Sequence, residues 1–130
     1  MTDTEMRALA KRFFDSVEAG DIDGLVACYA PDAKIWHNTD QLEQTPEDNR
    51  KTLAGMVTRI SDRLYDDRRI DVFPGGFVQQ HVLRGTRMHD GERLSLPACV
   101  ICQVKDGKIT RLDEYFDSAH VAQFRKYANA

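Results

Sequence analysis

Residues 77–116 read FVQQHVLRGTRM HDGE RLSLPACVICQVK DG KITRLDEYF, and this stretch decides the fold. The segments 77–88, 93–105 and 108–116 are long enough to form three extended strands. HDGE at 89–92 turns the chain between the first two segments, and DG at 106–107 is typical of a tight hairpin between the last two. The stretch therefore predicts an antiparallel meander of long strands.

The N-terminal part of the sequence predicts two helices that meet at a glycine. Apolar residues recur every three or four positions from Met6 to Val17, and Gly20 ends this first helix. Asp21 begins a short second helix, which we expect to continue to Tyr29. Each helix has one apolar face with which to cover a sheet.

A third helix is predicted between these helices and the meander. Thr-Pro-Glu-Asp at 45–48 is typical of a helix start, because it combines a capping hydroxyl, a proline in the first turn and acidic side chains. We expect the apolar face of this helix to extend through Met56 to Ile60 and Leu64. Two short strands at 33–38 and 69–73 and a polar loop at 40–45 account for the rest of this region.

A closing helix is expected after Asp117, with Val121, Phe124 and Tyr127 on one face. The element order predicts one α+β domain over residues 1–130, in which a curved antiparallel or mixed sheet packs on three N-terminal helices, plus a C-terminal helix. Because long strands twist and the helices cover only one face, a cone-shaped funnel should remain between them. Such a funnel, with a few polar groups among apolar walls, is typical of a small-molecule site.

Composition and charge argue against several classes of function. The hydrophobic fraction of 42% and the charged fraction of 30% are ordinary for a globular domain. The net charge of −3 offers no basic surface to phosphates, so we expect no nucleic acid partner. No apolar run reaches the length of a membrane span, and the N-terminus lacks a secretion signal. Three cysteines, an odd number, favour reduced thiols and a cytoplasmic location.

No motif for a metal or a cofactor stands out. Cys99 and Cys102 fall on opposite faces of a strand, which argues against a shared metal or a redox pair. The sequence contains no glycine-rich phosphate loop and no serine-nucleophile elbow. The four histidines, His37, His81, His89 and His120, have scattered spacing. We therefore expect neither a metal nor a cofactor.

Two ionisable residues are expected on inward faces of the meander. Glu114 lies between Leu112 and Phe116 on one face of the last strand, where a carboxylate suits a general acid or base. A structural hydrogen-bond network is the alternative role for this carboxylate. His81 shares a face with Leu83 on the central strand, and it can carry a proton or act as a structural donor. A pair of His81 with Glu114 across the sheet would favour catalysis.

The first strand offers an aromatic ring and an amide. Trp36 and Asn38 share one face of this strand, while His37 points the other way. Beside a pocket, such a pair can orient a substrate or a water molecule. A core tryptophan next to a strand-ending asparagine is an equally open interpretation.

Several short segments occur in a familiar order. They are FF at 13–14, AGDIDGL at 19–25, YAPDA at 29–33, IWHN at 35–38, DGKI at 106–109 and EYFD at 114–117. Together they resemble the SnoaL-like domains of the nuclear transport factor 2-like superfamily over nearly the whole chain. The resemblance implies a cone-shaped fold, the cystatin-like α+β barrel, around one apolar pocket. SnoaL-like polyketide cyclases, limonene-epoxide hydrolases and ketosteroid isomerases share this fold.

The layout, including TLAG at 52–55, is similar to that of the limonene-epoxide hydrolases. Those enzymes use a tyrosine and an amide on the first strand, an arginine flanked by carboxylates on the central strand and an aspartate on the last strand. Carried over by register, these positions hold Trp36, Asn38, His81 and Glu114, with Leu83 at the second carboxylate. The sequence also resembles the cyclases and ketosteroid isomerase, which remove a proton next to a carbonyl. This resemblance implies that His81 and Glu114 fit proton removal better than they fit epoxide hydrolysis.

Three functions are therefore considered. The first is a lyase, isomerase or cyclase that acts on a small apolar molecule, with Glu114, His81 and Asn38 as catalytic residues. The second is a non-catalytic module for small-molecule binding or dimeric interaction, and the third is an epoxide hydrolase-like enzyme, which Leu83 disfavours. The expected substrate-binding residues are Trp36, Leu83, Leu112, Phe116, Phe14, Met56, Leu96 and Val100. We also expect a homodimer through the exposed face of the sheet, which carries Val82, Met88, Cys99 and Ile101.

Overall fold

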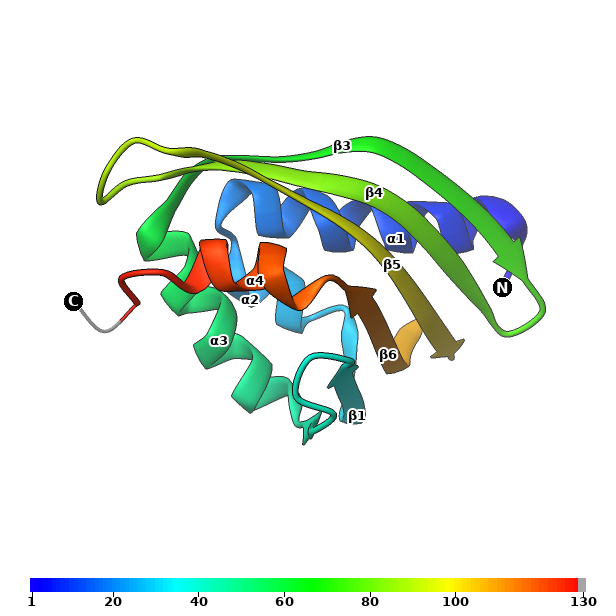
Figure 1. Cartoon of the computed structure of the whole chain (residues 1–130). Helices are drawn as coiled ribbons and strands as arrows, with labels where there is room; N and C mark the ends of the chain where they lie inside the picture. The colour runs from blue at the N-terminus through cyan, green and yellow to red at the C-terminus, as the bar shows by residue number, and fades with distance from the viewer. Residues whose placement is uncertain (129–130) are drawn as a thin grey trace.

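The computed structural model describes residues 1–128, and Figure 1 shows its helices and strands. The elements are α1 (Asp3–Ala19), α2 (Ile22–Val26), β1 (Tyr29–His37), β2 (Glu43–Gln44), α3 (Pro46–Arg59), β3 (Ile60–Phe73), β4 (Gly76–Arg87), β5 (Arg93–Lys105), β6 (Lys108–Phe116) and α4 (Ser118–Arg125). The strands form one sheet in the order β2-β1-β6-β5-β4-β3. Only β1 and β6 pair in parallel, so the sheet is mixed. The predicted α+β class is confirmed.

Two helices begin with reciprocal capping boxes. The Thr45 side chain accepts from the backbone N–H of Asp48, whose carboxylate accepts from the backbone of Thr45. Thr2 and Glu5 form the same arrangement at α1. These boxes satisfy backbone donors that a helix start leaves free. Gly20 ends α1 with φ 74°, a left-handed conformation that glycine adopts without steric cost.

The strand β3 is much longer than the sequence pattern predicted. We expected Ile60 and Leu64 to continue the third helix, but α3 ends at Arg59. Ile60 pairs with Arg87 of β4 and is fully buried, whereas Leu64 is exposed. The ladder shifts register twice, near Asp62 and Asp67, which both have positive φ. Because each bulge moves the apolar residues to the other face, the alternation typical of a strand is lost here.

The short helix α2 also differs from the expectation, because it ends at Val26 rather than at Tyr29. Tyr29 already belongs to β1, where it pairs with Ile109 of β6. The predicted polar loop at 40–45 contains β2, which pairs with β1. Pairing between strands therefore determines the secondary structure of this region, and local sequence patterns do not predict such pairing.

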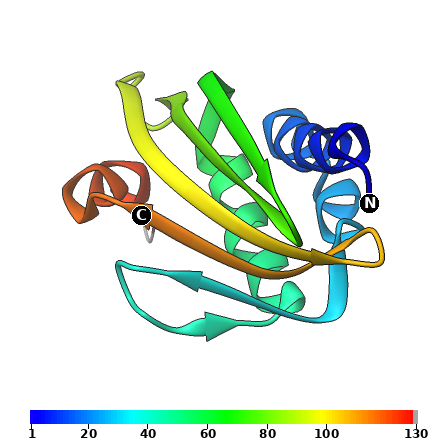
Figure 2. The same ribbon diagram turned by 90° about the vertical axis from the view of Figure 1, so that its right-hand side faces the viewer.

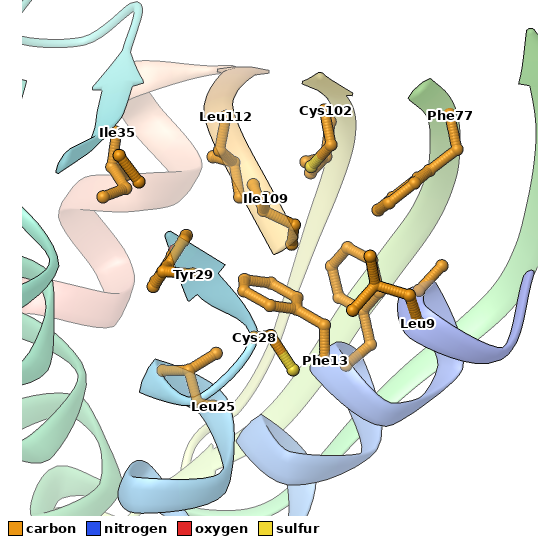
Figure 3. Packing of buried hydrophobic residues seen from close by; sticks show 14 of the residues in the cluster. Leu9, Phe13, Leu25, Cys28, Tyr29, Ile35, Phe77, Cys102, Ile109 and Leu112 are labelled. Atoms are coloured by element: carbon orange, nitrogen blue, oxygen red, sulfur yellow. The ribbon is translucent and has the colours of Figure 1, made fainter. Parts of the chain in front are cut away.

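The main core lies between α1 and the curved sheet. In Figure 1, β3, β4 and β5 arch over α1, and Figure 2 shows the curvature from the side. Leu9 and Phe13 of α1 face Phe77, Cys102 and Ile109 of the strands (Figure 3). A second cluster fills the sheet end beside α4; its buried members are Ile60, Leu83, Leu94, Leu96 and Phe124.

Candidate functional site

A small cavity inside the cone gathers the polar groups of the core. Its volume is about 40 Å³, which suits one water-sized molecule. Apolar side chains make most of its wall, and five of the lining residues carry a polar group in the side chain. The lining residues are Phe13, Phe14, Val17, Tyr29, Ile35, His37, Asn49, Leu53, Tyr65, Val100, Leu112 and Glu114.

The closest acid–base pair of this cavity is His37 with Glu114. The two residues are register partners on the parallel strands β1 and β6, and His37 Nε2 lies 3.3 Å from Glu114 Oε1. Their side chains are 15% and 19% exposed, and the His37 ring stacks on Phe116. Burial by itself lowers the pKa of His37, but the hydrogen bond to Glu114 and its charge offset burial and raise the pKa above its ordinary value. The pair is thus a half-buried proton-sharing unit.

A second polar pair is neutral. The Tyr29 hydroxyl donates to Asn49 Oδ1 at 2.9 Å, and both residues are buried. Burial raises the pKa of Tyr29 well above its ordinary value. Burial first, and then the charge of Glu114, raise the pKa of Tyr65 as well. Both phenols therefore stay protonated at neutral pH. Tyr29 donates its proton to Asn49, and Tyr65 can donate a hydrogen bond inside the cavity.

His81 does not form the expected pair with Glu114. Its Nδ1 lies 3.0 Å from Nε2 of Gln79, and β5 separates its strand from that of Glu114. The His81 ring packs edge-on against Phe14 and Tyr65, with centroids 5.1 Å and 4.6 Å away. Burial lowers the pKa of His81 to about 4, so the ring is neutral at pH 7. The partner of Glu114 is His37, which we expected on the outward face of its strand.

Trp36 and Asn38 also lie elsewhere than expected. Fully buried Ile35 sets the inner face of β1, which turns His37 inward and Trp36 outward. The Trp36 ring lies 5.4 Å from the ring of Tyr115, which is half exposed. The Asn38 side chain donates to the carbonyl of Phe116 and accepts from its N–H, both at 3.0 Å. This amide holds the end of β1 against β6. The sequence signal for His37 was the aliphatic Ile35 two positions before it, which alternation places on the same face.

The expected apolar wall divides between two places. Leu112, Val100 and Phe14 line the cavity. Leu83 and Leu96 belong to the cluster around Phe124, and Phe116 packs against that cluster. Met56 contacts both clusters and so lies between them.

Within residues 1–128, no three His, Cys, Asp or Glu side chains come together as ligands of a metal ion. None of the helices described is long and apolar enough to cross a membrane.

A larger hollow, of about 550 Å³, lies on the outer face of the sheet next to Val82, Cys99 and Tyr115. We place the candidate site in the interior, because the acid–base pair lies there.

Most of the sequence matches a known domain family. The family model of the SnoaL-like domain matches residues 10–112, and this chain therefore belongs to that family. Its fold is that of the nuclear transport factor 2-like superfamily, as the resemblance implied. No curated protein matches the sequence.

Solved structures share the whole fold at low sequence identity. A proposed polyketide cyclase from Xanthomonas campestris pv. campestris has 19% identity and a TM-score of 0.82, covering 93% of this chain and 97% of that chain. An LEH-like epoxide hydrolase from M. tuberculosis has 18% identity and a TM-score of 0.75, with 96% and 92% covered. A protein from Catenulispora acidiphila with a ketosteroid isomerase-like fold has 14% identity and a TM-score of 0.77, with 94% and 95% covered. Identities this low show the fold alone.

Proposed function

We propose that this chain is an enzyme that binds a small, mostly apolar carbonyl compound inside the cone and moves a proton next to the carbonyl. The observation that carries the proposal is the 3.3 Å contact between His37 and Glu114 in an apolar cavity. An acid and a base that share a proton in low-dielectric surroundings are suited to proton transfer. This is the first of the three functions expected from the sequence, but His37 replaces His81 as the partner of Glu114.

In this mechanism Glu114 is the base. His37 engages Oε1 and holds the carboxylate, which leaves Oε2 to accept the proton of the carbon next to the carbonyl. The electron pair of that C–H bond moves toward the carbonyl oxygen, and an enolate forms. The neutral phenol of Tyr65 also lines the cavity, and it is a donor of the kind that stabilises an enolate oxygen. Return of the proton to the same carbon, or to a conjugated one, completes an exchange or an isomerisation.

Substrate binding requires the cavity to open. Ligand pockets usually measure about 300 to 1,000 Å³, and the cavity of about 40 Å³ is far smaller. Met56 and Tyr65 pack against both apolar clusters, so their movement would join the cavity to the space around Phe124. The proposal therefore includes a rearrangement of these side chains on binding.

A non-catalytic module for small-molecule binding or dimeric interaction is the second candidate, and the small cavity favours the interaction role, which needs no space for a ligand. The epoxide hydrolase relay has less support. On β4, the residues at the arginine and carboxylate positions are His81 and Leu83, and Leu83 is buried in an apolar cluster. Three free cysteines suit the expected cytoplasmic location, which stays a prediction.

Solvent-deuterium exchange tests the proposed chemistry. Acetone, cyclohexanone and acetophenone are incubated with the protein in D₂O, and mass spectrometry follows the exchange of hydrogens next to the carbonyl. We expect the wild-type protein to accelerate exchange in at least one ketone. Glu114→Gln should lower the rate by about 100-fold or more, because it removes the base.

Asp113→Asn is the matched control. Asp113 is the preceding residue and pairs with Arg111 instead of lining the cavity, so its loss should leave exchange unchanged. Equal rates for wild type and Glu114→Gln would refute the assignment of the base. No exchange by the wild-type protein in any of the ketones would favour the binding module.

A further inference from the structure

His81 carries a buried polar atom with no partner. Its side chain is 4% exposed, and Nε2 makes no hydrogen bond to any residue described. The proposed proton transfer does not use this ring. A buried polar group without a partner costs stability, and folded proteins rarely keep one.

The contact with Gln79 decides which ring nitrogen carries the proton. The amide nitrogen of Gln79 is a donor and lies 3.0 Å from His81 Nδ1. A donor must face a lone pair, so Nδ1 accepts and the neutral ring carries its proton on Nε2. Gln79 is 2% exposed, and water cannot easily replace it in this role. The unpartnered atom of His81 is therefore an N–H donor.

The surroundings of this donor are shared with the cavity. The rings of Phe14 and Tyr65 pack edge-on against His81, and both residues line the cavity. Neither of these two rings accepts a hydrogen bond from His81 Nε2. His81 itself does not line the cavity, so a ligand would reach its Nε2–H group by displacing Tyr65, which contacts both.

We propose that the Nε2–H of His81 donates a hydrogen bond to the carbonyl oxygen of the ligand, and that Gln79 is the positioning residue that keeps the proton on Nε2. The inference deepens the proposed function, because it rests on a ligand that occupies the same cavity. It also names the ligand class as neutral carbonyl compounds. A hydrocarbon would leave the donor unsatisfied, whereas a carbonyl oxygen accepts its hydrogen bond.

The tautomer is tested first, without any ligand. Nitrogen-15 NMR of the histidine rings distinguishes a protonated from an unprotonated ring nitrogen. We expect His81 to carry its proton on Nε2 in the wild-type protein, and Gln79→Leu to give a mixture of both tautomers. A proton on Nδ1 in the wild-type protein would overturn the inference.

Ligand preference is tested next, with cyclohexanone and methylenecyclohexane. The two molecules have nearly the same shape, and only the ketone has an acceptor. NMR titration should show that the ketone binds more tightly by about threefold to tenfold, as expected for one neutral hydrogen bond. His81→Phe should abolish this preference, and His81→Gln should restore part of it, because its amide nitrogen lies near the Nε2 position. His89→Gln, an exposed histidine in a turn, is the control that should keep the preference.

The outcomes separate this inference from the proposed function. A ketone preference without deuterium exchange would keep the donor role of His81 and remove the chemistry. Exchange without a ketone preference, or a preference that survives in His81→Phe, would overturn the donor role and keep the chemistry. If His81→Phe does not fold because Gln79 loses its partner, the double variant Gln79→Leu/His81→Phe removes both polar groups and replaces the single variant.

Discussion

His37 takes part in an ion pair whose contribution to stability depends on pH. Burial opposes its charge, but the hydrogen bond and the charge of Glu114 raise the pKa of His37 above 6.5. A histidine with a raised pKa in the folded state stabilises the protein fully below its unfolded-state pKa, and this stability is lost as pH rises through the folded-state pKa. We expect His37→Gln to destabilise the protein by about 1 kcal/mol at about pH 6 and by much less at about pH 9.

Urea unfolding at the two pH values measures this difference. His89→Gln is the control, because His89 is exposed and lies in the turn after β4. It shows the effect of replacing a histidine that stacks on Tyr127 and lies outside the cavity. An equal loss for His37→Gln at both values would mean that the ring acts only by packing against Phe116.

At the residue scale, the sequence identified Glu114 but not its partner. Alternation tells which residues share a face, and it does not tell which face is buried. We took aromatic Trp36 as the inward residue, whereas fully buried Ile35 turns His37 inward. The contact between His81 and Gln79 joins positions i and i+2 of one strand, and no spacing rule in the sequence distinguished it from a pair with Glu114.

At the scale of elements, α4 is attached by one deeply buried side chain and a few hydrogen bonds. Phe124 is 4% exposed among the residues of the second cluster. Arg87 donates to the Gln123 carbonyl at 3.0 Å, and His120 Nδ1 lies 2.8 Å from the Ser95 carbonyl oxygen. We expect Phe124→Ala to cost about 3 to 5 kcal/mol of stability, because it removes a buried ring and leaves a cavity.

Urea unfolding measures this loss, with Arg125→Ala as the control on the same helix. Arg125 is exposed, so its replacement should change stability by less than about 0.5 kcal/mol. A loss below about 1 kcal/mol for Phe124→Ala would show that α4 collapses onto the cluster or is dispensable to it.

Elements with strong local signals were predicted well. Capping residues fixed the start of α3, and the turns fixed β4, β5 and β6 to within one residue of the expected segments. The strand β3 was missed over residues 60–68, because the bulges at Asp62 and Asp67 break the alternation. Only pairing with β4 makes that segment a strand, and such pairing is not a local property.

At the scale of the whole molecule, the order of elements was enough to predict the cone but not its interior. The volume of the cavity depends on how Tyr65 and Met56 pack between the two clusters. Periodicity assigns such residues to a face and says nothing about how far they fill the space. The small cavity and the neutral His81 are consequences of packing that only the three-dimensional structure reveals.

The outer face of the sheet is where we expect a second copy of this chain to bind. The hollow of about 550 Å³ on this face includes the apolar Val82, Pro97 and Tyr115 and, with them, Asp67 and Arg69. A twofold interface pairs a patch with itself, so a patch that holds both an acid and a base can form ion pairs across the axis. We therefore expect a homodimer that buries this hollow, and native mass spectrometry should give twice the mass of one chain.

Val82→Arg should convert this dimer to a monomer, because the substitution places two like charges close to each other across the axis. Glu92→Arg, in the exposed turn between β4 and β5, makes a comparable charge change away from the hollow and should leave the dimer intact. A wild-type protein with the mass of one chain at micromolar concentration would refute the dimer. A dimer that persists in Val82→Arg would place the interface on another surface, and the hollow would then be open to solvent.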